Sequence, residues 1–241
     1  MVLQRLEGSP LANELLSIPL PPSTIGSIPV FDAVILACVI KLVRPKRVLE
    51  FGTFLGYSTR IILENSDDDC DIVSIDLPHG SKLGDSSLDV TDSQLHSSAA
   101  VNDDFLRQLQ FRRGARYLES LTANQQRRLN LLKIDSRQVK PDSLLDGSGP
   151  CFDLIFIDGG HDAETIASDT ALAFATASGK ATIVWHDYGS TIHTDVTEFL
   201  NKSAHHLRIL FVQGTLIAMT HCGPDPILQP EDISSFRLTT P

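Results

Sequence analysis

The chain has 241 residues, of which 42% are hydrophobic and 21% charged, and its formal net charge at pH 7 is −10. This size and composition are typical of a single α/β domain with a large core, so we treat residues 1–241 as one domain. The negative charge argues against general binding to nucleic acids or to anionic membranes. The four cysteines form no C-x-x-C pair, which argues against a zinc or dithiol site and favours a reducing, cytoplasmic location.

The N-terminal part predicts helices and no membrane span. The most apolar window, residues 33–40, is too short to cross a bilayer, and no long apolar region suggests a signal peptide. A short helix is expected from Pro10 to Ser17, followed by a proline-rich link and a helix over residues 29–43. We therefore expect residues 1–45 to form an N-terminal helical cap.

Apolar runs of strand length alternate with helical segments along the rest of the chain. Residues 77–128 form a long polar crossover and possible substrate lid, in which we expect an insertion around residues 79–98. The alternation predicts an α/β, Rossmann-like, doubly wound and mostly parallel sheet. The expected strands are 47–51, 71–76, 129–134, 152–157, 180–185, 207–212 and 215–219, and the expected helices are 59–64, 99–110, 163–177 and 191–203.

Each of five successive predicted strands has an acidic residue at its carboxyl end or within two positions of it. Ligands of such sheets bind outside the carboxyl ends of the strands. A single acid there is often a helix cap or turn former, but five on one edge indicate a site for a cation, a metal or several hydroxyl groups. These acids are Glu50, Asp76, Asp135, Asp158 and Asp187.

The segment from Glu50 to Ser58 reads as a strand end, a glycine turn and a helix start. Gly52 permits a left-handed backbone and close approach of a ligand. The free amides at the start of the helix can hold a carboxylate, while Glu50 balances a cationic centre. S-adenosylmethionine (SAM) carries both groups. A nicotinamide dinucleotide is disfavoured because Phe54 stands where its G-x-G-x-x-G fingerprint requires glycine.

The sequence E-F-G-T-F-L-G-Y-S at 50–58 resembles the first motif of the class I SAM-dependent methyltransferases. By that resemblance, Asp76 grips both ribose hydroxyls of SAM, and Asp135 with Ser136 borders the adenine. The resemblance further implies a seven-stranded sheet with a reversed last strand, around Gly214-Thr215. The implied cofactor-binding residues are Glu50, Gly52, Thr53, Gly56, Tyr57, Ser58, Asp76, Asp135, Ser136 and Asp158.

A second motif, F-I-D-G-G-H at 156–161, together with Asp169-Thr170 and W-H-D-Y at 185–188, resembles a bacterial-type subgroup of O-methyltransferases. Members act on small molecules, including sugars of natural products, and some need Mg²⁺. Family members often pair, which leaves a homo-oligomer open. The chain departs from the pattern at Ala177–Lys180, where a Pro-Gly-Gly turn is usual, and at His186-Asp187, where Glu-Asp is usual and the metal is thereby in doubt.

Methyl transfer to a hydroxyl requires removal of a proton, for which a histidine or a metal is suited. His161, three residues after Asp158, is the expected base, and His161 and Asp158 are the expected catalytic residues. Asp158 and Asp187 end adjacent strands and can converge on Mg²⁺. Without metal, Asp158 can contact the acceptor and Asp187 can orient His161. Alternation along a strand argues that His186 and Asp187 do not both face the site.

These patterns favour a SAM-dependent methyltransferase that O-methylates a small-molecule hydroxyl, of sugar or natural-product type. The alternatives are a hydroxylase or a non-catalytic SAM-binding protein on the same fold. The presence of His161 and Asp158 counts against a non-catalytic protein.

Overall fold

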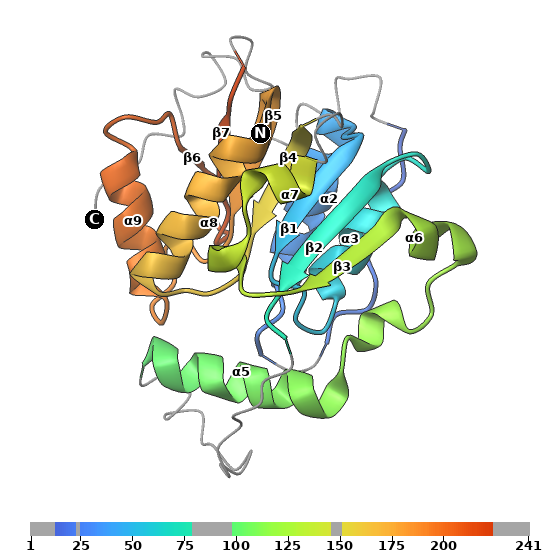
Figure 1. Cartoon of the computed structure of the whole chain (residues 1–241), viewed down its shortest axis with the longest axis horizontal. Helices are drawn as coiled ribbons and strands as arrows, with labels where there is room; N and C mark the ends of the chain where they lie inside the picture. The colour runs from blue at the N-terminus through green and yellow to red at the C-terminus, as the bar shows by residue number, and fades with distance from the viewer. Residues whose placement is uncertain (1–12, 23–24, 79–97, 146–150, 224–241) are drawn as a thin grey trace.

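The computed structural model describes residues 13–22, 25–78, 98–145 and 151–223, which contain a seven-stranded sheet in the order β3-β2-β1-β4-β5-β7-β6 (Figure 1). β1 to β5 run parallel, and β7 runs antiparallel to both of its neighbours, β5 and β6. The predicted Rossmann-like, mostly parallel sheet with a reversed last strand is confirmed. The strands are β1 (Arg47–Phe51), β2 (Asp71–Asp76), β3 (Leu129–Lys133), β4 (Phe152–Ile157), β5 (Ala177–Trp185), β6 (Leu210–Phe211) and β7 (Ala218–His221).

Helices cover both faces of the sheet. Buried side chains of α2 and α3 form one core cluster with alternate strand residues, and those of α7, α8 and α9 form a second cluster with the strand residues between them. This is the packing that a doubly wound sheet requires. The helices are α2 (Val30–Val43), α3 (Tyr57–Asn65), α5 (Ala99–Arg113), η1 (Arg116–Leu118), α6 (Ala123–Arg128), η2 (Ser136–Gln138), α7 (Pro141–Leu145), α8 (Ala163–Thr176) and α9 (Thr194–Ser203).

Two expectations about local structure are wrong. Ser178 and Gly179 were expected to form a turn between the helix 163–177 and the strand 180–185, but β5 already begins at Ala177, which pairs with Phe152 across a register irregularity. The strand pairing outweighs the turn preference of Ser178-Gly179. Residues 13–17 are not helical, contrary to the helix expected from Pro10 to Ser17, and the rest of that segment lies outside the described residues. Most of the expected insertion also lies outside them.

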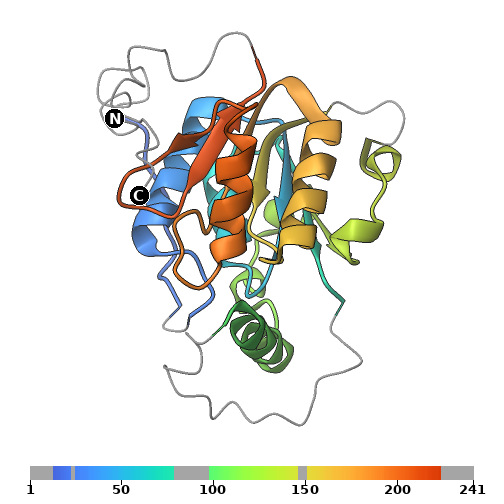
Figure 2. The ribbon, with the colours of Figure 1, turned by 90° about the vertical axis from the view of Figure 1, so that its left-hand side faces the viewer.

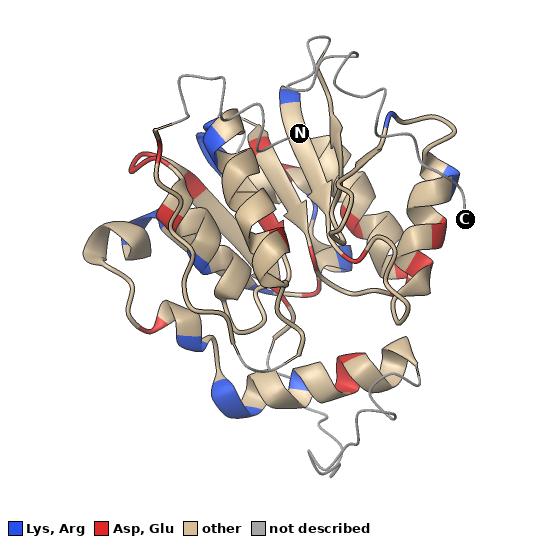
Figure 3. Cartoon of the chain, turned by 180° about the vertical axis from the view of Figure 1, so that it is seen from behind, with Lys and Arg blue, Asp and Glu red and all other residues tan. Residues whose placement is uncertain are grey.

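Acidic and basic residues are interspersed over the described helices and loops (Figure 3). Arg112 and Arg113 lie exposed in the last turn of α5, where a positive charge is favourable next to the negative end of the helix dipole. The position at the end of the helix therefore explains these two arginines without an anionic ligand. Within the described ranges, none of the helices has the length and apolar composition needed to cross a membrane.

A buried carboxyl group anchors the turn after β1. Glu50 is fully buried, and it accepts hydrogen bonds from the hydroxyl groups of Ser58 at 2.7 Å, Thr59 at 2.6 Å and Ser74 at 2.6 Å. Burial raises the pKa of Glu50 to about 7, although the three hydrogen bonds oppose the rise. One carboxyl group thus ties together β1, β2 and the start of α3.

The substitution Glu50→Gln should change how stability depends on pH. Between the ordinary pKa of 4.5 and about 7, the folded chain holds a proton that the unfolded chain has released, so stability falls as pH rises through this range. Relative to E50Q, the wild type should lose about 3 kcal/mol of unfolding free energy over this range. Urea denaturation at a series of pH values measures this difference.

The control is Asp71→Asn, which removes an exposed carboxylate at the start of β2. It should keep the wild-type dependence on pH. Parallel pH profiles for the wild type and E50Q would contradict the assignment.

Candidate active site

The carboxyl ends of the parallel strands open into a cavity of about 580 Å³ that α5 also lines. α5 lies as a separate layer beyond this edge of the sheet (Figures 1 and 2). The volume is in the range of small-molecule pockets. The polar lining residues include Gly52 after β1, Asp76 on β2, Asp135 and Ser136 after β3, Asp158 and His161 after β4, His186, Asp187 and His193 after β5, and Asp103 and Gln110 on α5.

The cavity gathers part of the site expected from the sequence. Asp158, the expected catalytic and metal-binding residue, lies in the lining together with His161. The expected site residues in the lining are Gly52, Asp76, Asp135, Ser136, Asp158, His161 and Asp187, while Glu50, Thr53, Gly56, Tyr57 and Ser58 are not in it.

The side chains of Glu50, Thr53 and Tyr57 do not reach the cavity. They make contacts inside the protein that stabilise the turn after β1. The Thr53 hydroxyl lies 2.8 Å from that of Ser74. Tyr57 is buried; its hydroxyl donates to the Pro19 carbonyl at 3.2 Å, and its ring meets Tyr117 edge-on with centroids 5.2 Å apart. Tyr57 is therefore a core residue in this structure, and Glu50 faces hydroxyl groups of the protein.

Two glycines shape the turn after β1. Gly52 and Gly56 have φ values of +92° and +85°, which are strained for other residues. A Cβ atom on Gly52 would lie 2.0 Å from the carbonyl oxygen of Asp158, and one on Gly56 would lie 2.6 Å from the Leu118 side chain. The turn therefore packs directly against the loop after β4.

Asp76 lies in the cavity wall with its carboxylate held by side chains. The Lys133 ammonium donates to Asp76 Oδ2 at 2.9 Å, and the Gln110 amide donates to the same oxygen. The Gln110 amide also donates to the Phe54 carbonyl at 3.0 Å, so α5 is tied to two strand ends. Because these donors are side chains, hydroxyl groups of a ligand can replace them.

Two carboxyl groups whose pKa values are shifted in opposite directions lie near the end of β3. Asp135 accepts a hydrogen bond from the Arg137 backbone at 3.0 Å and pairs with its guanidinium at 2.7 Å; these contacts lower the pKa of Asp135. Asp169 is buried, and its Oδ1 has no hydrogen-bond partner among the described residues. Burial raises the pKa of Asp169 to about 6.

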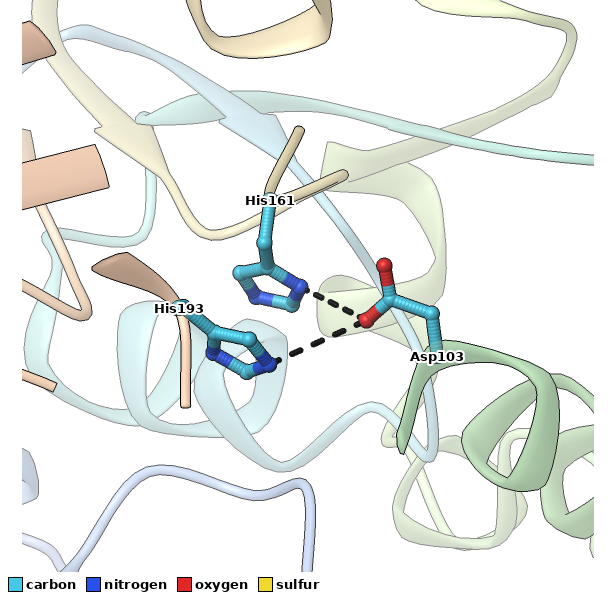
Figure 4. A group of neighbouring side chains, drawn as sticks. All are labelled: Asp103, His161 and His193. Atoms are coloured by element: carbon cyan, nitrogen blue, oxygen red, sulfur yellow. Dashed lines mark hydrogen bonds and ion pairs between the residues drawn. The ribbon is translucent and has the colours of Figure 1, made fainter. Parts of the chain in front are cut away.

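Carboxylates and imidazoles alternate beside the loop after β4. Asp187 Oδ2 lies 3.1 Å from His161 Nε2 and 3.2 Å from His186 Nδ1, and Asp187 Oδ1 lies 3.2 Å from His193 Nδ1. On α5, Asp103 Oδ1 lies 2.9 Å from His161 Nδ1 and 3.8 Å from His193 Nε2 (Figure 4). The rings of His161 and His193 are stacked, with centroids 3.6 Å apart and planes 4° apart.

In this cluster the carboxylates raise the pKa of the histidines, and the histidines lower the pKa of Asp187. Burial by itself would lower the pKa of His161, but hydrogen bonds to Asp103 and Asp187 outweigh it and raise the pKa to about 10. Burial opposes the charged form of His186 as well, yet Asp158 and Asp187 raise its pKa well above the usual value. The pKa of Asp187 is held well below its usual value despite burial, chiefly by His186.

His186 and Asp187 both line the cavity, which corrects the expectation that alternation would separate them. β5 ends at Trp185, and Asp187 has a φ of +62°, so the strand geometry does not extend to these residues. The other ring nitrogen of His186, Nε2, lies 3.0 Å from Asp32 Oδ2 on α2. His186 thereby links Asp187 to the first turn of α2.

The residues fit Mg²⁺ poorly. Donor atoms of Asp158, His161 and Asp187 lie within 4.8 Å of one another. Mg²⁺ prefers an octahedron of oxygen ligands, whereas this set includes an imidazole, and the Asp187 carboxylate already faces His161, His186 and His193. The donor set is better suited to a softer metal.

The sequence did not reveal Asp103, His193 or Asp32 as site residues. Asp103 lies in the middle of the crossover and His193 after β5, so neither belongs to a local motif, and only the tertiary fold brings them to His161. Asp32 lies in an apolar helix, where a buried acid is unusual. An acidic residue within an apolar helix was therefore the one feature of the sequence that could have pointed to Asp32.

A family model described as a methyltransferase domain matches residues 49–188, more than half of the chain. A search of curated proteins finds no match. Among solved structures, the calicheamicin methyltransferase CalS11 has a TM-score of 0.56 at 14% identity, over 91% of this chain and 89% of that one. The S-adenosylhomocysteine (SAH)-bound methyltransferase PaMTH1 of Podospora anserina has a TM-score of 0.51 at 15% identity, over 85% and 83%.

These structural similarities show a shared fold, and the family model covers the strands that build the cavity, from Leu49 to Tyr188. This chain therefore belongs to the methyltransferase domain family and is a class I SAM-dependent methyltransferase.

Proposed function

We propose that this enzyme transfers the methyl group of SAM to a hydroxyl group of a small molecule. The observation that carries the proposal is a single cavity with acidic residues near the ends of β2 and β3 and a histidine–aspartate cluster after β4 and β5. The sulfonium of SAM leaves as a neutral thioether and needs no acid, whereas an attacking hydroxyl must lose a proton. The cluster supplies groups that can take it.

In the proposed complex, SAM lies along the ends of β1, β2 and β3. Backbone groups of the turn at Gly52 and Phe54, which line the cavity, receive its methionine carboxylate. Asp76 accepts hydrogen bonds from the two ribose hydroxyls in place of Gln110 and Lys133. Asp135 and Ser136 border the adenine.

His161 is the proposed base for the acceptor. Both of its ring nitrogens face carboxylates, Asp103 at 2.9 Å and Asp187 at 3.1 Å. With both carboxylates in contact, His161 is protonated at neutral pH, because its pKa is about 10. A hydroxyl that displaces Asp103 removes one of the two hydrogen bonds that raise this pKa, and the Nδ1 proton leaves with the displaced carboxylate. The free ring nitrogen can then take the proton of the hydroxyl as the carbon–oxygen bond forms. Asp158, 3.3 Å from His186, is proposed to orient the acceptor.

Acceptor specificity is proposed to come from the crossover and the N-terminal segment. Ile25, Leu106 and Ile192 line the cavity together with the cluster, which favours an acceptor with an apolar part. α5 belongs to the crossover 77–128, and its contacts across the cavity support a lid role for that segment. A natural-product hydroxyl, of a sugar or similar group, is the proposed acceptor type.

The substitution Asp76→Ala should weaken binding of SAH on the order of 100-fold, because two hydrogen bonds to a charged group are lost. Calorimetric titration of the purified protein with SAH measures the change. Asp71→Ala removes the same charge from the opposite, exposed end of β2 and should bind like the wild type. Equal affinities for D76A and D71A would contradict the ribose assignment, and no binding by the wild type would contradict the proposed function.

The substitution His161→Ala should leave SAH affinity nearly unchanged and reduce turnover by roughly 10²–10⁴, the range for a general base. Turnover is measured as SAH release from SAM in the presence of a panel of sugar and phenolic acceptors. His206→Ala, at an exposed histidine after α9, is the control and should keep wild-type turnover. Wild-type turnover in H161A would show that His161 has only a structural role.

A further inference from the structure

We infer that α5 is an autoinhibitory helix. Its side chains occupy the groups proposed to bind the cofactor and the acceptor, and SAM must loosen it before the acceptor can enter. The inference rests on the proposed function, because it takes Asp76 as the ribose ligand and His161 as the base. It adds an order of binding to that function. α5 lies beyond the carboxyl edge of the sheet, where both reactants are proposed to bind (Figures 1 and 2).

Two side chains of α5 contact the two groups on which the reaction depends. The Gln110 amide donates a hydrogen bond to Asp76 Oδ2. Asp103 Oδ1 lies 2.9 Å from His161 Nδ1, the nitrogen that is proposed to take the proton of the acceptor (Figure 4). Asp103 and Gln110 are about two helical turns apart, so they project from the same face of the helix. One helix therefore blocks both halves of the site.

Polar contacts rather than the core hold α5 in place. Its buried residues are Asn102, Gln108, Leu109 and Gln110, of which only Leu109 is apolar. Leu109 belongs to neither of the two core clusters that the described residues form. Hydrogen bonds exchange for water at a modest net cost, and elements that bury little apolar surface are the first to open locally. α5 can therefore leave its position while the sheet stays folded.

The carboxylate of Asp76 cannot serve both α5 and a ribose. A carboxylate has about four acceptor positions. Three donors already use this one, namely the Leu77 backbone at 3.0 Å, the Lys133 ammonium at 2.9 Å and the Gln110 amide. Two ribose hydroxyls exceed the remaining capacity, so at least one donor must leave. Leu77 and Lys133 belong to the sheet and the residue that follows it, whereas Gln110 belongs to the helix that can move.

Both contacts hold the same helix, so a change at one of them affects the other. When a ribose displaces Gln110, α5 loses its tie to Asp76 and holds Asp103 less firmly against His161. The acceptor hydroxyl can then displace Asp103, and SAM therefore binds first. Coupling between two sites is reciprocal. Release of Asp103 must accordingly tighten cofactor binding, although Asp103 contacts the base and not the ribose ligand.

The test is calorimetric titration of Asp103→Ala with SAH. The variant lacks the contact with His161, so α5 is displaced in a larger fraction of the molecules, and the apparent affinity rises with that fraction. SAH should bind about 10-fold more tightly than to the wild type, the effect of one hydrogen bond to a charged group. The matched control is Asp104→Ala, which removes the same charge from the next residue. Asp104 is exposed and lies 3.5 Å from the exposed Arg107, so D104A should bind SAH like the wild type.

Hydrogen–deuterium exchange of the wild type provides a second measurement that needs no variant. Saturating SAH should speed the exchange of the backbone amides of α5, because the helix loses its ties to the site. α8 packs in the core and serves as the internal reference, so its amides should not exchange faster.

Equal SAH affinities for D103A and D104A would overturn the inference, and so would slower exchange of α5 on SAH binding. Circular dichroism of D103A shows whether the fold is intact. If D76A weakens SAH binding while D103A does not tighten it, the inference alone is contradicted. If the wild type binds no SAH, the proposed function is contradicted and the inference with it.

Discussion

Parallel pairing of β1 to β5 is the constraint on which the site depends. Strands that run in one direction bring all their carboxyl ends to one edge, and the residues that follow them must meet there. The sheet therefore brings the polar residues after each strand together, and their own ion pairs then orient the side chains. The sheet buries apolar side chains on both faces, so the energy that positions these polar groups comes from the core.

The buried charges of the histidine–aspartate cluster stabilise one another. A buried ion is costly by itself, and removing one partner of a buried pair leaves the other uncompensated. Asp187 faces three imidazoles, and His186 connects it to Asp32 at the start of α2. Helices and loops from distant parts of the chain therefore depend on the same few charges, which is why the cluster can organise the cavity wall.

The sequence predicted those parts of the molecule that depend on local patterns. The bounds of β2 and β4 match the expected strands, because apolar runs ended by acids carry a clear signal. The extension of β5 to Ala177 was missed because strand pairing overrode a local turn preference. At the site, Asp76 and Asp158 were found as strand ends. Asp103 and His193 were not, because their proximity to His161 arises only when α5 and the loop after β5 fold over the sheet.

The close packing of Gly52 has a consequence for the reaction. With the Asp158 carbonyl oxygen 2.0 Å from where a Cβ on Gly52 would stand, the turn after β1 and the loop that carries His161 touch backbone to backbone. In the proposed complex these two segments border the methyl donor and the acceptor. Main-chain contact between neighbouring strands would then set the separation of the two reactants, and exchange of side chains around the cavity would alter which acceptor enters rather than how far the methyl group must travel.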